Sequence, residues 1–150
     1  LSETLADYPN VEIINNDILK VDVDKIIAEK MSDCEKIMVV ANLPYYITTP
    51  ILTHLIENTE KIDGYVVMMQ KEVANRLNAK VGTKDYNSLT ILLNYYTNVE
   101  YLFTVPKKVF VPAPNVESAV VKIMTKDKKE FEADSKFFKF VRSCFVQRLY

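Results

Sequence analysis

The stretch IMVVANLPYYITTPILTHLIENT, residues 37–59, predicts a strand, a stiff corner and a helix in direct succession. The apolar run at 37–43 is typical of a strand that is covered on both faces. In 48–59, threonines able to cap a helix and Pro50 in the first turn precede apolar residues at helical spacing. A buried strand followed by an amphipathic helix is the repeating unit of α/β proteins.

The same alternation continues along the chain in both directions. We expect strands at 11–17, 63–70, 99–105 and 118–124, and helices at 22–31, 71–80, 88–97 and in the tail 134–150. The last two strands flank a proline-rich loop and are expected to be antiparallel. The alternation of strands and helices in the rest of the sequence predicts a mostly parallel sheet with helices on both faces.

Length and composition narrow the class of protein. A chain of 150 residues that is 49% hydrophobic and 26% charged is typical of one globular domain. Its two glycines, Gly64 and Gly82, are too far apart to form a P-loop or a G-x-G dinucleotide turn. Any nucleotide pocket must therefore be built without a glycine-rich cradle, or be completed by residues outside this sequence.

Charge and cysteine usage add weaker indications. The net charge of −1 divides into −7 over residues 1–66, +1 over 67–100 and +5 over 101–150. A basic face towards a polyanion is one interpretation of this distribution and a solvated surface is another. Cys34, Cys144 and a single histidine make no zinc site, and both cysteines are expected to be small buried residues. Without a signal peptide or a long apolar run, we expect a soluble intracellular protein.

Polar clusters follow three of the expected strands, at 15–17, 42–45 and 70–72. In such sheets, ligands bind beyond the carboxyl ends of the strands. At 42–45, Asn42 offers an amide oxygen, the peptide carbonyls beside Pro44 offer a second acceptor, and Tyr45 offers a flat ring. Two acceptors and a stacking face suit a planar heterocycle that carries an exocyclic amine. A strand-to-helix turn without chemistry would use the same four letters.

The amine of adenine is a weak nucleophile because its lone pair is delocalised into the ring. Two hydrogen bonds accepted from that amine favour a pyramidal nitrogen with a more localised pair, ready for in-line transfer from a methyl sulfonium. An adenine in a nucleic acid must first be unstacked, and an aromatic ring can then hold it.

Four segments together resemble the ribosomal RNA adenine dimethyltransferases, the KsgA family of class I methyltransferases. They are NLPYYITTPI (42–51), QKEVANRL (70–77), FVPAPNVESAVV (110–121) and RSCFVQR (142–148), in the order of the family's motifs. The resemblance implies a Rossmann-like sheet, with a partial catalytic domain at 1–126 and the beginning of a small C-terminal helical domain at 127–150.

The resemblance also implies roles at the cofactor and at the target base. Asp17 would accept a hydrogen bond from the adenine of S-adenosylmethionine, with the backbone of Ile18 nearby, and Asn42 would lie against the methionine end. Asn42 and Pro44 would hold the target N6 amine, and Tyr45 and Phe110 would enclose the base between their rings.

Other residues receive weaker assignments. Gln70 and Glu72 would order the rim of the site, although Glu72 also suits the first turn of a helix. His54, Tyr95 and Tyr96 are expected to be structural. The basic residues of the second half could face RNA phosphates, or simply be solvated: Lys107, Lys108, Lys126, Lys128, Lys129, Lys136, Lys139, Arg142 and Arg148.

The family's glycine-rich cofactor loop and its ribose-binding acidic residue have no counterpart in this sequence. We therefore expect the N-terminal strands to be missing and the chain alone to bind S-adenosylmethionine weakly. The implied function is dimethylation of adenine N6 in small-subunit ribosomal RNA during ribosome biogenesis, by a monomeric cytoplasmic enzyme without membrane contact. The alternatives are a large-subunit methyltransferase of the macrolide-resistance type and a non-catalytic RNA-binding assembly factor.

Overall fold

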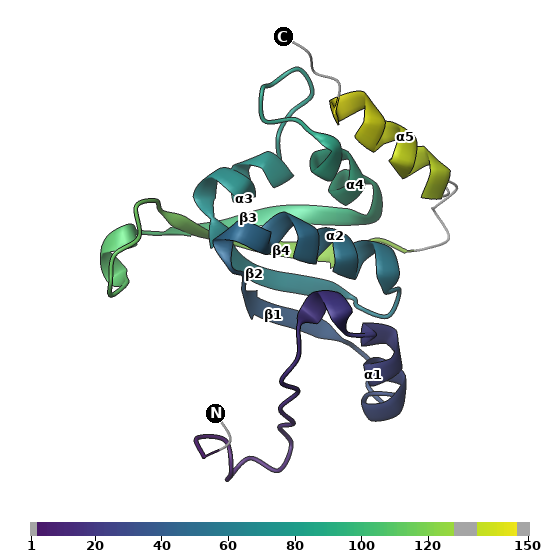
Figure 1. The fold of residues 1–150 in the computed structure, drawn as a ribbon, viewed down its shortest axis with the longest axis vertical. Helices are drawn as coiled ribbons and strands as arrows, with labels where there is room; N and C mark the ends of the chain where they lie inside the picture. Colours follow the sequence, from purple (N-terminus) through teal and green to yellow (C-terminus); the bar gives the residue numbers. More distant parts are fainter. Residues whose placement is uncertain (1–2, 128–134, 147–150) are drawn as a thin grey trace.

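The computed structural model describes residues 3–127 and 135–146. Its sheet has the strand order β1-β2-β4-β3 (Figure 1). The strands are β1 (Met38–Asn42), β2 (Gly64–Gln70), β3 (Thr97–Val105) and β4 (Ser118–Thr125). The predicted antiparallel pairing of the last two strands is confirmed. β4 lies between β2 and β3 and is antiparallel to both, so β1, β2 and β3 run in the same direction. Among the described strands β4 alone is reversed, which agrees with the predicted mostly parallel sheet.

All five predicted helices are present. They are α1 (Val23–Lys30), α2 (Thr48–Asn58), α3 (Lys71–Leu77), α4 (Ser88–Tyr96) and α5 (Ser135–Val146), with short 3₁₀ turns η1 (Ile18–Lys20), η2 (Tyr45–Ile47) and η3 (Lys107–Val109). In Figure 1, α2, α3 and α4 lie against one face of the sheet, and α5 lies beside α4.

That covered face contains the hydrophobic core. Alternate residues of the two central strands point into it, as the two-residue period of a strand requires. They pack with the apolar sides of the helices, and the cluster includes Leu52 of α2, Leu93 of α4 and Phe138 of α5. Phe138 of α5 belongs to the same hydrophobic cluster as residues of α2 and α4. The domain division at 126/127 stays a prediction.

The opposite face of the sheet is largely open. Val66 and Met68 of β2 are half-buried, while Val40 of β1 is 80% exposed and Phe103 of β3 is 55% exposed. The described helices thus cover one of the two faces that were predicted to be covered. The run at 37–43 is apolar, yet β1 is the edge strand of the described sheet and is not buried on both faces.

Residues 11–17, predicted as a strand, form an exposed segment without regular structure that runs away from the sheet (Figure 1). Val11, Ile13 and Ile14 are between 42% and 47% exposed. β-branched residues favour extended backbone, but a strand also needs a neighbour for its backbone hydrogen bonds. No described strand pairs with this segment.

Two further expectations concern the burial of the cysteines and the presence of membrane-spanning helices. Cys34 and Cys144 are exposed free thiols, so the prediction that they are buried is wrong. Among residues 3–127 and 135–146, the helices are all too short or too polar to cross a membrane.

Candidate functional site

The corner at residues 42–48 forms where β1 ends. The N–H of Leu43 donates to the carbonyl of Met68 at 3.0 Å, which extends the pairing with β2 by one residue. Pro44 is the N-cap of η2, and its carbonyl accepts from the N–H of Ile47 at 3.2 Å and from the hydroxyl of Thr48 at 2.9 Å. The predicted threonine cap of α2 is wrong, because Ile47 is the N-cap and Thr48 instead fixes the corner. A proline and two hydrogen bonds make the corner stiff.

Two hydrogen-bond acceptors at this corner are available. The side chain of Asn42 is exposed, and within the described part of the chain it has no hydrogen-bond partner. No described residue donates to the carbonyl of Leu43. The carbonyl of Pro44, in contrast, already accepts two hydrogen bonds, which fill both of its lone pairs. The free acceptors are therefore the Asn42 amide oxygen and the Leu43 carbonyl.

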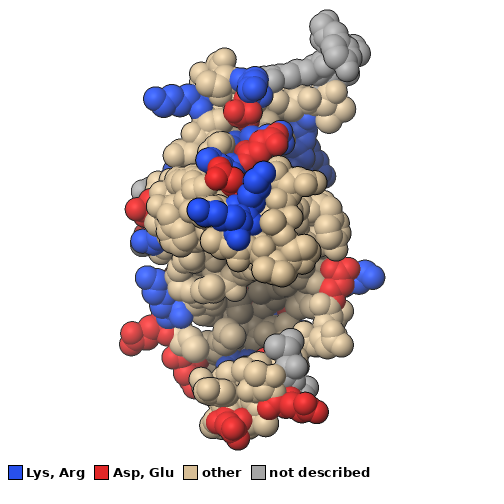
Figure 2. Space-filling view, turned by 90° about the vertical axis from the view of Figure 1, so that its left-hand side faces the viewer, with Lys and Arg blue, Asp and Glu red and all other residues tan. Residues whose placement is uncertain are grey.

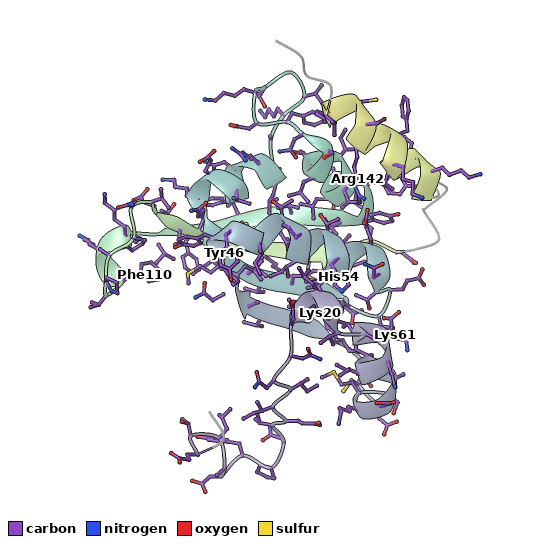
Figure 3. The ribbon with its side chains drawn as sticks, in the orientation of Figure 1. Lys20, Tyr46, His54, Lys61, Phe110 and Arg142 are labelled. Atoms are coloured by element: carbon purple, nitrogen blue, oxygen red, sulfur yellow. The ribbon has the colours of Figure 1, made fainter. Side chains whose placement is uncertain are left out.

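A cavity of about 340 Å³ adjoins this corner. It is formed by the corner and by the segment between β3 and β4, and its lining residues are Asn42, Leu43, Pro44, Tyr45, Phe110, Pro112 and Pro114. The segment between β3 and β4 protrudes from the end of the sheet in Figure 1. Figure 3 shows Phe110 on this segment and Tyr46 at the same end of the sheet, while Lys61 lies at the opposite end. The structure thus brings together Asn42, Pro44, Tyr45 and Phe110, as the sequence predicted.

A hydrogen bond connects the corner to the strand that follows the Phe110 segment. The hydroxyl of Tyr45 lies 2.6 Å from the hydroxyl of Ser118. Ser118 is fully buried and begins β4, where it pairs with Gln70 of β2 and Val105 of β3. In the sequence, Ser118 was noted only as part of the segment 110–121, and its side-chain contact with Tyr45 was not predicted.

The segment that carries Phe110 is also fixed just before Ser118. The backbone N–H of Lys71 donates to the carbonyl of Glu117 at 2.9 Å, and the Lys71 ammonium donates to the Glu117 carboxylate at 2.8 Å. The hydrogen bond and the negative charge of Glu117 raise the pKa of Lys71 above its usual value. The end of the segment is thus fixed to the start of α3.

Of the predicted cofactor residues, Asn42 lines this cavity, whereas Asp17 and Ile18 lie outside it. Asp17 is the N-cap of η1, and its Oδ1 accepts from the N–H of Leu19 at 3.1 Å. Ile18 packs partly against the hydrophobic core. Of the predicted rim residues, Gln70 ends β2, and Glu72 lies in the first turn of α3 in an ion pair with Arg76. The roles of these residues stay predictions.

The residues expected to be structural have packing partners. The rings of Tyr95 and Tyr96 contact each other edge to face, and both contact the ring of Phe138. His54 lies 3.1 Å from the side-chain amide of Asn58 through Nδ1 and lines a separate cavity of about 310 Å³ between α2 and residues 19–23.

Basic side chains gather at the end of the molecule that carries the cavity. Figure 2 looks onto this end and shows Lys and Arg side chains at its centre, with acidic ones among them, above an uncharged hollow. Lys71 and Arg76 of α3 form ion pairs, whereas Lys107 and Lys108 of η3 are exposed and have no partner among the described residues. Three other basic residues named from the sequence lie outside the described residues: Lys128, Lys129 and Arg148.

Comparison with solved structures places the fold in a known class. The chain matches the crystal structure of a dimethyladenosine transferase from Plasmodium falciparum with a TM-score of 0.78 and 28% identity, over 97% of this chain and 49% of that one. It matches the crystal structure of the 23S rRNA methyltransferase ErmE with a TM-score of 0.67 at 24% identity, over 97% of this chain and 54% of that one, which bears on the fold alone. The fold is the Rossmann-like fold of methyltransferases.

Comparison of sequences identifies the family. Residues 1–149 match the family described as Ribosomal RNA adenine dimethylase, and the chain belongs to this family. It is 57% identical to the Ribosomal RNA small subunit methyltransferase A of Staphylococcus haemolyticus and 54% identical to that of Staphylococcus aureus (strain JH9), over 99% of this chain in both cases. The chain spans about half the length of these curated relatives, 51% and 50% respectively.

Proposed function

We propose that this chain holds the target base in an S-adenosylmethionine-dependent methyltransferase, and that the complete enzyme dimethylates N6 of adenines in small-subunit ribosomal RNA. The observation that carries the proposal is the cavity at the end of β1. It combines free acceptors on Asn42 and Leu43 with the rings of Tyr45 and Phe110. An unstacked adenine offers the matching features, an amine and two flat faces.

The corner would act on the amine directly. Asn42 Oδ1 and the Leu43 carbonyl would each accept one N6–H hydrogen bond, which localises the lone pair on nitrogen and aims it at the methyl donor. The carbonyl of Pro44 instead keeps the corner rigid, since Ile47 and Thr48 already donate to it. Fixed acceptors of this kind need no reorganisation during the reaction.

The residues present fit the cofactor that the family implies. One carboxylate oxygen of Asp17 accepts from Leu19, while the other lies 4.0 Å from the Lys20 ammonium on an exposed surface, which leaves it able to accept from an amine. Asp17, Ile18 and Asn42 would hold S-adenosylmethionine, which supplies the methyl group as a sulfonium when bound. This assignment is part of the proposal.

The small subunit is favoured as the source of the substrate. The relatives named as small-subunit methyltransferases are 54% to 57% identical to this chain, whereas the 23S enzyme ErmE is 24% identical. We place the enzyme in the cytoplasm as a monomer that acts on small subunits during ribosome biogenesis. A non-catalytic assembly factor would keep the fold and the RNA contacts but transfer no methyl group.

Methyl transfer to isolated subunits tests the proposed function. A full-length methyltransferase that carries this sequence is incubated with labelled S-adenosylmethionine and undermodified ribosomal subunits, and dimethylated adenines are mapped as primer-extension stops. We expect stops in small-subunit RNA. Stops in large-subunit RNA would support the macrolide-resistance type, and RNA binding without transfer would support the assembly factor.

The unpaired lysines beside Phe110 are expected to contact RNA phosphates. We expect the double variant Lys107→Ala/Lys108→Ala to bind small-subunit RNA more weakly, with the slope of log K against log salt reduced by about two, since each phosphate contact releases about one counterion. Filter binding between low and high salt measures the slope.

Two exposed lysines at the other end of the sheet provide the control. Lys36 precedes β1 and Lys61 precedes β2, and both are exposed. The Lys36→Ala/Lys61→Ala variant makes the same change in net charge, so an equal loss of salt dependence in both variants would contradict a specific role for Lys107 and Lys108.

A further inference from the structure

The hydrogen bond between Tyr45 and Ser118 connects a half-buried side chain of the corner to a buried residue of the sheet. The two hydroxyls are 2.6 Å apart. Tyr45 is half-buried in a single 3₁₀ turn, whereas Ser118 is fully buried at the start of β4 and is paired with strands on both sides. The backbone of Tyr45 is thus fixed by a short turn, and the hydroxyl at the far end of its side chain is fixed by a strand.

The same strand also fixes the opposite wall of the cavity. Ser118 directly follows Glu117, which is bonded twice to Lys71, and the segment from Phe110 runs into this point. The position of Ser118 therefore determines both where the Tyr45 ring lies and where the Phe110 segment ends. A buried hydroxyl without a partner is unfavourable, so the bond also gives this oxygen its partner.

We propose that Ser118 is a positioning residue for the target base, which it aligns by holding the phenol of Tyr45. The inference rests on the proposed function, in which Tyr45 and Phe110 enclose the base. Ser118 touches no substrate in this scheme. It restricts the tilt of the Tyr45 ring, so that a stacked adenine presents N6 to Asn42 and Leu43 in one orientation. Small displacements from the reactive geometry are costly in rate.

Three variants of the full-length methyltransferase test the proposal: Ser118→Ala, Tyr45→Phe and the double variant. We expect each single change to lower kcat about tenfold. The KM for RNA should be unchanged, because contacts to the phosphate backbone of the RNA supply most of the affinity. We expect the double variant to lose about tenfold as well, because both changes remove the same hydrogen bond. Tyr45→Phe keeps the ring and adds no atoms, so the test does not depend on whether Ser118→Ala folds.

A matched control separates positioning from general stability. Thr97 is also buried, at 2% exposure, and its hydroxyl donates to the Leu93 carbonyl at 2.6 Å at the opposite end of β3. Thr97→Val removes a buried hydroxyl at a distance from the cavity. We expect Thr97→Val and Ser118→Ala to lower the melting temperature similarly, with only Ser118→Ala lowering kcat.

The possible failures can be told apart. If the wild-type protein transfers no methyl group, the proposed function is wrong. If the wild type is active and Ser118→Ala has the same kcat as the wild type or as Thr97→Val, the role of Ser118 is wrong. Losses that multiply to about a hundredfold in the double variant would also overturn it, since they would show that the two hydroxyls act separately.

Discussion

Replacement of Asn42 by alanine is expected to lower the rate of methyl transfer by about a thousandfold, the effect of deleting one preorganised hydrogen-bonding group at a reacting atom. The change removes one of the two free acceptors at the end of β1 and leaves the Leu43 carbonyl alone. A single acceptor no longer holds both N6 protons, so the nitrogen lone pair stays conjugated with the ring. Single-turnover transfer to undermodified small subunits measures the loss.

The fold should survive this substitution. The Asn42 side chain is exposed and contributes no hydrogen bond to the described structure. Asn58→Ala is a suitable control, since Asn58 is an exposed asparagine of α2 that bonds to His54, outside the cavity. We expect Asn58→Ala to retain nearly full activity. Normal turnover of Asn42→Ala, with circular dichroism unchanged, would contradict the role assigned to Asn42.

Replacement of Leu93 by alanine is expected to destabilise the fold strongly. Leu93 is fully buried in α4 within the core beneath the sheet. Its truncation removes buried apolar surface and leaves a cavity that the packed neighbours fill only partly. We expect the free energy of unfolding to fall by about 3 to 5 kcal/mol. Urea denaturation followed by circular dichroism measures this change.

An exposed leucine of β3 provides the matched control. Leu102 is 39% exposed, so Leu102→Ala deletes the same atoms with much less lost packing. We expect it to lower the free energy of unfolding by less than about 1 kcal/mol. Equal unfolding midpoints for the two variants would show that Leu93 is not a core residue in solution.

Local patterns predicted the helices and four of the five strands well. The periodicity of 48–59 and 88–97 arises from burial on one side of each helix, and this burial is present in the structure. The segment 11–17 was predicted wrongly because β-branched residues record a preference for extended backbone and not the presence of a partner strand. The order of the sheet could not be read from local patterns either, because it depends on which strands meet.

The candidate site could be predicted in composition but not in its connections. The residues Asn42, Tyr45 and Phe110 were singled out from their motifs, and the structure gathers them around one cavity. Which carbonyl beside Pro44 is free depends on the turn that Ile47 and Thr48 form with Pro44, and which residue holds the Tyr45 ring depends on a contact between distant segments. Thr48 and Ser118 carry this information, and in the sequence they are two hydroxyl residues among many.

The prolines of the cavity wall have a consequence for base selection. Pro44, Pro112 and Pro114 have no backbone N–H, so three of the seven lining residues offer a bound base no backbone donor. A base with an amine at its reacting edge finds acceptors there, whereas guanine would place its O6 oxygen against the lone pairs of the Leu43 carbonyl, which can only accept. Guanine would then be disfavoured by repulsion between like partial charges at this carbonyl.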